Sequence, residues 1–224
     1  MSEIRVNNII ADNGLDAVNF AKGINVSSGI ITATSFSGSG ANLTTLPAAN
    51  LTGTLPAISG ANLTGLSSGL SMADIWRISS GGTLGTDTIT QFTSNWERAD
   101  TYGTGQLGSG MTESSGVFTF PSTGIYQVTA MMQFKRNSGE NRFADLNIQV
   151  TTNNSSYNTA AVGAASFAQD YSTNTAVANL FLDVTNVSTH KVRFNAYTNR
   201  SSILYLANST SNACSFTFLK LGET

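Results

Sequence analysis

The sequence predicts an all-β protein in two parts: a fibrous repeat shaft behind a short N-terminal anchor, and a β-sandwich or barrel at the C-terminal end. Three observations predict this fold class. SGANLT at Ser39–Thr44 returns at Ser59–Thr64, residues 23–70 hold no charged side chain and no histidine, and the chain beyond Ser71 alternates short strand-like segments with turns. Gly, Ser, Thr and Asn, which favour strands and turns, are abundant throughout.

The repeat predicts a shaft that several copies of the chain build together. A third ANLT at residues 49–52 lies between the two longer copies. Ordering one copy of this segment costs more conformational entropy than its few apolar side chains return, and a lone strand leaves its backbone unpaired. We therefore expect three chains to wrap around one axis over residues 23–70. The leucines expected in the shared core are Leu43, Leu46, Leu51, Leu55, Leu63 and Leu66.

Residues 1–22 differ from the repeat because they are charged and carry the separate apolar side chains Ile4, Val6 and Ile10. They are either a frayed terminus or a segment that docks on another protein. The opening SEIRVNNI, followed by NFAKGINVSSGIITATSF and GSGANLT, resembles the start of tail-fibre and related virion proteins of bacteriophages, notably those that infect marine cyanobacteria. The resemblance covers residues 1–70 and implies attachment through Ile4, Val6 and Ile10 to a baseplate, tail or capsid protein.

Residues 71–224 predict a compact head made of strands, with no helical periodicity. Alternation is regular at 144–150 and 191–197, and turn residues such as Gly81-Gly82 and Asn153-Asn154 separate the segments. Many strands joined by turns are typical of a sandwich or barrel. The predicted strands are Ile75–Ser79, Thr88–Phe92, Gly116–Phe120, Ile125–Phe134, Arg142–Thr151, Ala176–Val184, Lys191–Ala196, Ile203–Leu206 and Cys214–Leu221.

One motif in the head is specific. GVFTFPSTGIYQV, residues 116–128, resembles the centre of the complement C1q and tumour-necrosis-factor head, and the last strand SFTFLKL is similar to that family's closing strand. The resemblance covers residues 71–224 and implies a jelly-roll β-sandwich that trimerises, with the last strand in its core. The sequence departs from the family at Val128, where Phe is frequent, and around Ser188–His190, where the family has Gly-Asp.

Composition excludes several classes of partner. Only 11% of residues are charged, the net charge is −2 and no basic stripe exists, so we expect no nucleic acid. No apolar run is long enough for a membrane span or a signal peptide. We therefore expect a protein made in the host cytoplasm and carried in the virion. The single cysteine, Cys214, excludes an intrachain disulfide and is expected to be a small buried apolar residue.

No pattern of catalytic or metal-binding residues is present, so we expect no enzyme, no metal and no cofactor. His190 is the only histidine and is expected in a turn where a strand begins. No His/Cys cluster, phosphate loop or Asp-rich calcium loop occurs. The scattered aspartates leave open a paired-carboxylate glycosidase, which would require two of them about 5–10 Å apart.

The expected function is a homotrimeric phage fibre that recognises a glycan or protein on the host surface through loops at the far tip of its head. The alternatives are a capsid or tail decoration fibre with a structural role and a polysaccharide-degrading tailspike. Aromatic, arginine and amide side chains in loops are candidates for recognition, although for any one of them a subunit contact or an ordinary surface position is the favoured interpretation. The residues selected are Arg136, Arg142, Asn153, Asn154, Tyr157 and Tyr171; Tyr102, Tyr197 and Arg200 are weaker candidates.

Overall fold

The computed structural model describes residues 26, 30, 32, 69–139, 142–199 and 203–224. The chain divides into two compact units, Met1–Gly60 and Ala61–Thr224. The second unit holds every strand of the described residues, and we call its described part, from residue 69 onward, the head. The predicted anchor lies outside the described residues. So do the six leucines that were predicted to form the shaft core, and their roles stay predictions.

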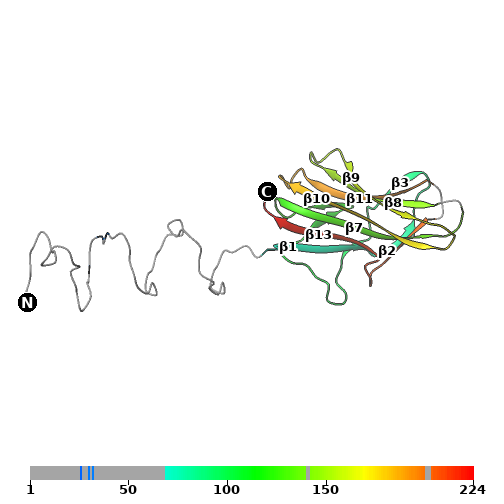
Figure 1. The fold of residues 1–224 in the computed structure, drawn as a ribbon, viewed down its shortest axis with the longest axis horizontal. Helices are drawn as coiled ribbons and strands as arrows, with labels where there is room; N and C mark the ends of the chain where they lie inside the picture. Colours follow the sequence, from blue (N-terminus) through cyan, green and yellow to red (C-terminus); the bar gives the residue numbers. More distant parts are fainter. Residues whose placement is uncertain (1–25, 27–29, 31, 33–68, 140–141, 200–202) are drawn as a thin grey trace, which may run out of the picture. The chain divides into compact units, whose positions relative to one another are not determined.

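The described residues of the head form strands and no helix, as Figure 1 shows. The strands are β1 Met72–Ile78, β2 Ser80–Thr83, β3 Thr88–Gln91, β4 Trp96–Arg98, β5 Thr112–Ser114, β6 Val117–Thr119, β7 Gly124–Arg136, β8 Phe143–Thr151, β9 Asn158–Ser166, β10 Thr173–Val184, β11 Lys191–Thr198, β12 Ile203–Asn208 and β13 Cys214–Gly222.

Two antiparallel sheets make up the sandwich. Sheet A follows the order β2-β12-β7-β13-β1-β4, and β10 covers the other edge of β7. One edge of β7 is therefore shared, because β12 pairs near Arg136 while β13 pairs from Met132 onward. Sheet B follows the order β5-β6-β11-β8-β9, with β3 also paired to β11. The all-β, jelly-roll-type architecture predicted for residues 71–224 is confirmed.

The core lies between the sheets and is built by strict alternation. Every second side chain of β7, from Gly124 to Arg136, is buried, which is the period of a strand with one face on a core. Aromatic rings fill the centre: Phe194 of β11 lies 4.5 Å from Phe216 of β13, centroid to centroid, and both are fully buried. β13 therefore runs through the core, as the resemblance implied.

The motif at residues 116–128 has a physical reason for its glycines and tyrosine. Gly116 adopts a φ of +82°, which disfavours side chains, and its backbone lies against the carbonyl of Phe92. The Tyr126 ring is fully buried against Phe120, and its hydroxyl donates to the carbonyl oxygen of Ser122 at 3.0 Å. The Pro121–Gly124 turn therefore connects two buried segments, and it supplies a hydrogen-bond acceptor for the buried Tyr126 hydroxyl.

All nine predicted strands are present, with ends shifted by a few residues. Four strands were missed: β2, β4, β5 and β9. The interpretation of Gly81-Gly82 as a turn was wrong, because both glycines belong to β2, which pairs with β12 and places Gly82 opposite Tyr205. These glycines sit in a strand because the opposite residue, Tyr205, covers the space that a side chain at position 82 would need.

Candidate functional site

The outward side chains in the middle of sheet A are uncharged, and Arg77, Lys135 and Asp183 lie on the same face of the sheet. The strand register aligns Val177, Met131, Ser215 and Arg77 in one row across β10, β7, β13 and β1. The next two rows are Asn179-Thr129-Thr217-Ile75 and Phe181-Gln127-Leu219-Ala73. Their sequence neighbours on β7, such as Val128 and Ala130, are fully buried, so these side chains point outward. We call these three rows the assembly face.

Exposed apolar side chains concentrate at the β10 edge of this face. Phe181 is 67% exposed and Val177 is 54% exposed, although both belong to regular strand positions. β9 lies directly beside β10, because a β-carbon on Gly163 would overlap the carbonyl of Val177. Val162 of β9 is exposed as well. The margin where the two sheets meet is therefore apolar and close-packed at these residues, and Asp183 lies two positions beyond Phe181 on the same face of β10.

The outer face of sheet B has different chemistry, because it carries charges and amides. Arg193 lies 4.0 Å above the Tyr157 ring, and its Nε donates to Gln149 Oε1 at 2.8 Å. Asn147 donates to Asn195 Oδ1. Burial raises the pKa of Asp145 on β8 of this face. The outer face of sheet B therefore carries charged and amide side chains that contact one another, which the middle of the outer face of sheet A does not.

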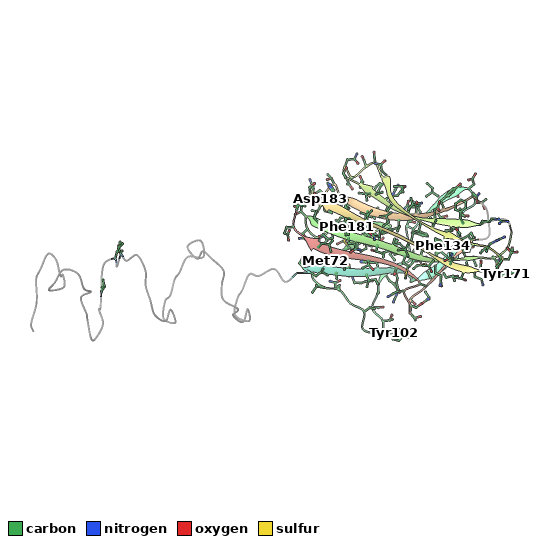
Figure 2. The ribbon with its side chains drawn as sticks, viewed as in Figure 1. Met72, Tyr102, Phe134, Tyr171, Phe181 and Asp183 are labelled. Atoms are coloured by element: carbon green, nitrogen blue, oxygen red, sulfur yellow. The ribbon has the colours of Figure 1, made fainter. Side chains whose placement is uncertain are left out.

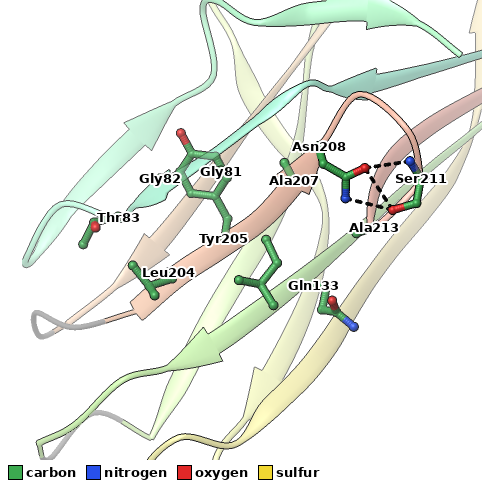
Figure 3. Close-up of a pocket in the computed structure, with 11 residues that line it drawn as sticks. Gly81, Gly82, Thr83, Gln133, Leu204, Tyr205, Ala207, Asn208, Ser211 and Ala213 are labelled. Carbon is green, nitrogen blue, oxygen red and sulfur yellow. Dashed lines mark hydrogen bonds between the residues drawn. The ribbon is translucent and has the colours of Figure 1, made fainter.

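A pocket of about 570 Å³ opens where β12 and β13 diverge beside β7 (Figure 3). Its walls include Leu204 and Tyr205 of β12, Gln133 of β7 and the backbone of Gly81 and Gly82. Leu204 pairs with Lys135 of β7. The side chains of Lys135 and Gln133 lie on the same outward face of β7, so this wall of the pocket is on the outer side of sheet A. Sequence reasoning did not find this pocket, because residues 206–213 loop out of an otherwise continuous strand.

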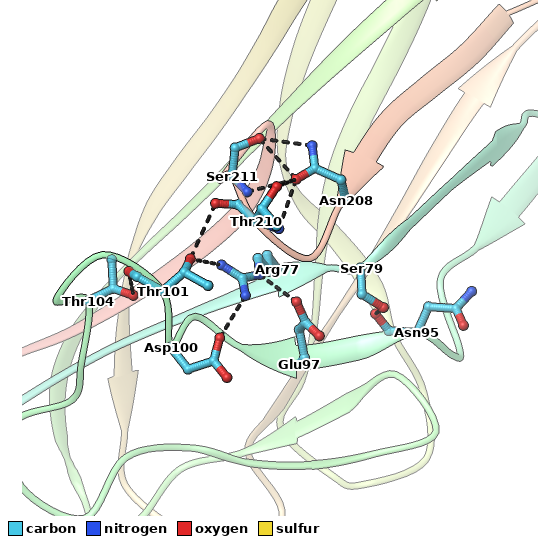
Figure 4. A network of polar contacts seen from close by, with 10 residues as sticks. All are labelled: Arg77, Ser79, Asn95, Glu97, Asp100, Thr101, Thr104, Asn208, Thr210 and Ser211. Carbon is cyan, nitrogen blue, oxygen red and sulfur yellow. Dashed lines mark hydrogen bonds and ion pairs between the residues drawn. The ribbon is translucent and has the colours of Figure 1, made fainter.

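A buried arginine, Arg77, holds the loop that follows β4 through ion pairs with more exposed carboxylates (Figure 4). Arg77 points outward from β1 but is only 1% exposed, since it donates to Glu97 Oε1 at 2.6 Å, to Asp100 Oδ1 at 2.8 Å and to Thr101 Oγ1 at 2.9 Å. Thr101 in turn donates to the carbonyl oxygen of Thr210. This network ties the loop to the 206–213 segment.

The same loop presents Tyr102 to solvent. Tyr102 is 92% exposed and has a φ of +54°, and the Thr104 amide donates to the carbonyl of Thr101 to close a tight turn around it. At the other end of the loop, Asp74 accepts from Arg98 and from the Met111 amide. The loop is therefore fixed at both ends, and its aromatic tip is displayed by a rigid base.

Three of the predicted recognition residues lie at the end of the head where β7 finishes and β10 begins. Arg136 is 8% exposed, and its Nη2 lies 2.8 Å from Asp170 Oδ1. Arg142 is exposed. Tyr171 is 67% exposed with a φ of +59°, and Figure 2 shows it at the opposite end of the head from Met72. We call this the far end of the head.

The other three predicted residues lie at the end where the chain enters and finishes. Asn153 caps its own turn, because its Oδ1 accepts from the amides of Ser155 and Ser156. The Asn154 amide donates to the carbonyl of Thr189, next to His190 and β11. Thr151 and Lys191 are paired at this end, where Met72 also pairs with Lys220. The six residues therefore do not form one site, and their role in binding stays a prediction.

The remaining candidates are accounted for by local structure or lie outside the described residues. His190 Nδ1 lies 3.0 Å from the carbonyl oxygen of Asn186, in the turn expected before β11. Cys214 is buried, as predicted. Tyr197 donates to Asp87 Oδ1. Arg200, like Ile4, Val6 and Ile10, is not among the described residues.

Searches for metal and membrane features apply to the same residues. Within residues 69–139, 142–199 and 203–224, no group of His, Cys, Asp and Glu side chains is arranged to hold a metal ion. No helix there is long and apolar enough to cross a membrane.

Comparisons with known proteins identify the fold. No protein-family model and no curated protein matches the sequence. Among solved structures, an Eiger TNF from S. frugiperda is similar with a TM-score of 0.50 and 12% identity, over 68% of this chain and 93% of that chain. Murine APRIL has a TM-score of 0.48 and 12% identity, and the match covers 67% of this chain and 98% of murine APRIL. The vertex protein P5 of phage PRD1 has a TM-score of 0.45 and 19% identity, and the match covers 69% of this chain and 100% of P5. The head is a TNF-like jelly roll.

Proposed function

We propose that this chain is a phage virion fibre that works as a parallel homotrimer, attached to the particle by its N-terminal segment and in contact with the host through its head. The single observation that carries the proposal is the exposed apolar margin of the assembly face at Phe181, Val177 and Val162. A monomer would leave Phe181, Val177 and Val162 in water, and contiguous exposed apolar surface marks sites of association.

Self-association is favoured because one chain carries two different surfaces that suit each other. The β9–β10 margin projects apolar side chains, and the outer face of sheet A offers an uncharged surface around Thr217 and Leu219. Contacts between unlike surfaces of identical chains form a closed ring when the rotation between neighbouring copies closes. A ring of three matches the shared shaft expected from the leucine repeat.

The positions of the head's termini support a parallel arrangement. Met72 pairs with Lys220, so the chain enters and leaves the head at the same end. In a parallel trimer, the three residues 71 would come together and lead into one shaft. The far end, which carries Tyr171 and Arg142, would then be the first part of the head to meet a host, and three copies would add avidity to a weak site.

Sedimentation or native mass measurement of the full chain tests the assembly. A species with three chains is expected, and a compact monomer at micromolar concentration would refute the proposal.

Host recognition is tested separately with fluorescent full-length protein on host cells. Gold-labelled antibody against the head, applied to particles, distinguishes a tail fibre from a capsid decoration fibre. Release of new reducing ends from host polysaccharide would instead support the tailspike alternative.

A further inference from the structure

The loop between β4 and β5 carries a second exposed apolar patch, at the edge of sheet A opposite β10. Tyr102 is 92% exposed and Leu107 is 47% exposed. Leu107 and Ala73 exchange two backbone hydrogen bonds, of 3.2 and 2.8 Å. Both sequence neighbours of Ala73 are buried, so Ala73 points outward, and Leu107 opposite it points to the same side. The row of the assembly face that begins at Phe181 therefore ends at Leu107.

The other exposed side chain of the loop lies near the level of a second row. In antiparallel sheets the rows of paired residues cross the strands, so the two ends of a row lie at one level along them. The row that begins at Val177 ends at Arg77. Arg77 Nη1 donates to Thr101 Oγ1 at 2.9 Å, and Tyr102 follows directly. Each exposed apolar residue of the loop therefore has a counterpart near its own level on β10.

The loop holds these side chains in a fixed and uncharged setting. Residues 101–111 contain no charged residue. Thr101 is tied at one end, and the Met111 amide donates to Asp74 Oδ2 at 2.7 Å at the other. Figure 2 shows Tyr102 at the tip of a loop that stands away from the sheets. A side chain that is already held in place loses little conformational freedom when a partner covers it.

We propose that this loop is the second contact surface of the trimer, and that its partner is the β10 margin of a neighbouring copy. Tyr102 packs on the neighbour's Val177, and Leu107 packs on the neighbour's Phe181. The inference rests on the proposed parallel trimer and names the residues of its second surface. A ring of unlike contacts requires two different patches on each chain. Rotation about an axis along the strands keeps every residue at its level, so patches at matched levels on opposite edges are able to meet.

Cysteine cross-linking of the full-length chain tests the contact. Cys214→Ala first removes the native thiol. In that background, Tyr102→Cys combined with Val177→Cys should be joined between chains by a short bismaleimide, giving covalent dimers and trimers on a denaturing gel. Tyr102→Cys combined with Ile89→Cys is the matched control, because Ile89 is 60% exposed but lies on sheet B. The control pair and each single-cysteine variant should run as monomers.

A charge at the loop tip tests the same contact without cross-linking. Tyr102→Asp should move the midpoint between trimer and monomer to a protein concentration at least about tenfold higher, because a carboxylate would be buried without a partner. Leu107→Asp should act in the same direction. Tyr171→Asp is the matched control, since Tyr171 is also an exposed tyrosine with a φ of +59°, against +54° for Tyr102. Sedimentation measures the midpoints, and circular dichroism checks that each variant folds.

The outcomes separate this inference from the proposed function. A monomeric parent would refute the proposed trimer itself. A trimeric parent in which Tyr102→Cys and Val177→Cys do not cross-link, or in which Tyr102→Asp and Leu107→Asp associate like the parent, would refute only this inference. If Tyr102→Asp keeps its trimers but no longer adsorbs to host cells, the loop contacts the host and the inference is wrong. Specific cross-linking together with weakened trimers in both aspartate variants would support it.

Discussion

Gly116 lies so close to the carbonyl oxygen of Phe92 that a β-carbon at position 116 would overlap it. Gly103 has nearly the same backbone conformation, with a φ of +79° against +82°, but nothing lies within 4 Å of the position of its missing side chain. The pair therefore separates backbone strain from steric overlap. Gly103→Ala is expected to lower the free energy of unfolding by about 1–2 kcal/mol, the penalty of the left-handed conformation.

Gly116→Ala should cost about 1–3 kcal/mol more than Gly103→Ala, because the Phe92 backbone must move. Guanidinium denaturation of both variants and the parent measures the difference. Equal losses of stability in the two variants would show that the Gly116–Phe92 contact yields without strain, contrary to this expectation.

Arg77 is expected to be the most important ion-pairing residue for the loop that carries Tyr102. Arg77→Met keeps the apolar stem but leaves Glu97 and Asp100 without their buried partner, and should destabilise the head by about 1.5–3 kcal/mol. Arg142→Met, which alters an exposed side chain, should change stability by no more than about 0.5 kcal/mol. Thermal or denaturant unfolding reports both, and limited proteolysis near Tyr102 should accelerate only in Arg77→Met.

The strands with clear alternation could be predicted from the sequence because their physics is local. β7 alternates buried and half-buried residues throughout, β8 and β11 do so over part of their length, and the Phe-rich β13 has the composition of a core strand. β2 and β9 were missed because SGGT and NTAAVGAAS consist of small or polar residues with weak strand preference. β2 and β9 form because they pair with β12 and β8. The sequence of a single segment does not show which strand it pairs with.

The candidate sites were harder to predict, since they depend on which segments the topology brings together. The predicted loop tyrosines, arginines and asparagines lie at both ends of the head. The sequence did not show which residues lie at which end. A usable signal was present in β10: apart from Asn179, the run AVANLFL is apolar on both faces, and a strand that is apolar on both faces is typically buried on both sides. In the described chain, one of those faces is exposed at Val177 and Phe181, which indicates a missing partner.

The assembly face is tested by a charge on β10. Phe181→Asp should dissociate the trimer, because a carboxylate would be buried in an uncharged interface without a partner. Ile89→Asp is the matched control, since Ile89 is 60% exposed on β3 of sheet B and Phe181 is 67% exposed on sheet A. Analytical ultracentrifugation should show monomers or weakened trimers for Phe181→Asp alone. Trimers that persist in Phe181→Asp, or dissociate in both variants, would place the interface elsewhere.

The separation of the predicted recognition residues gives a directional test. With the anchor on the particle, Tyr171→Ala at the far end should reduce adsorption to host cells about tenfold or more, as expected when an aromatic contact is truncated. Tyr157→Ala, at the end next to Met72, should leave adsorption unchanged. Flow cytometry of labelled fibres measures both. Loss of adsorption in Tyr157→Ala with normal adsorption in Tyr171→Ala would reverse the proposed orientation of the head.

Cys214 links stability to pH at the alkaline end. Burial raises the pKa of its thiol from the ordinary 9.0 to about 12, and its Sγ lies 3.1 Å from the carbonyl oxygen of Leu206. In the unfolded chain the thiol ionises near pH 9, whereas in the folded chain it stays protonated until about pH 12. The folded state therefore binds more protons between these values, and its stability relative to the unfolded chain falls as pH rises through that window.

Replacing the thiol isolates this contribution from the tyrosines, several of which also have a raised pKa. Cys214→Ala removes the ionisable group and leaves a small apolar side chain, so it should be less stable than the parent at pH 7 but should lose less stability between pH 9 and pH 12. Denaturation midpoints at pH 7, 9 and 10.5 give the change of stability with pH for the parent and for Cys214→Ala.

In the folded parent, the thiol should also remain unreactive towards a disulfide reagent at pH 8 and react fully once the protein is denatured, because only the thiolate attacks. Parallel slopes for the parent and Cys214→Ala, or rapid labelling of the folded protein, would mean that Cys214 is less buried than its position beneath Leu206 implies.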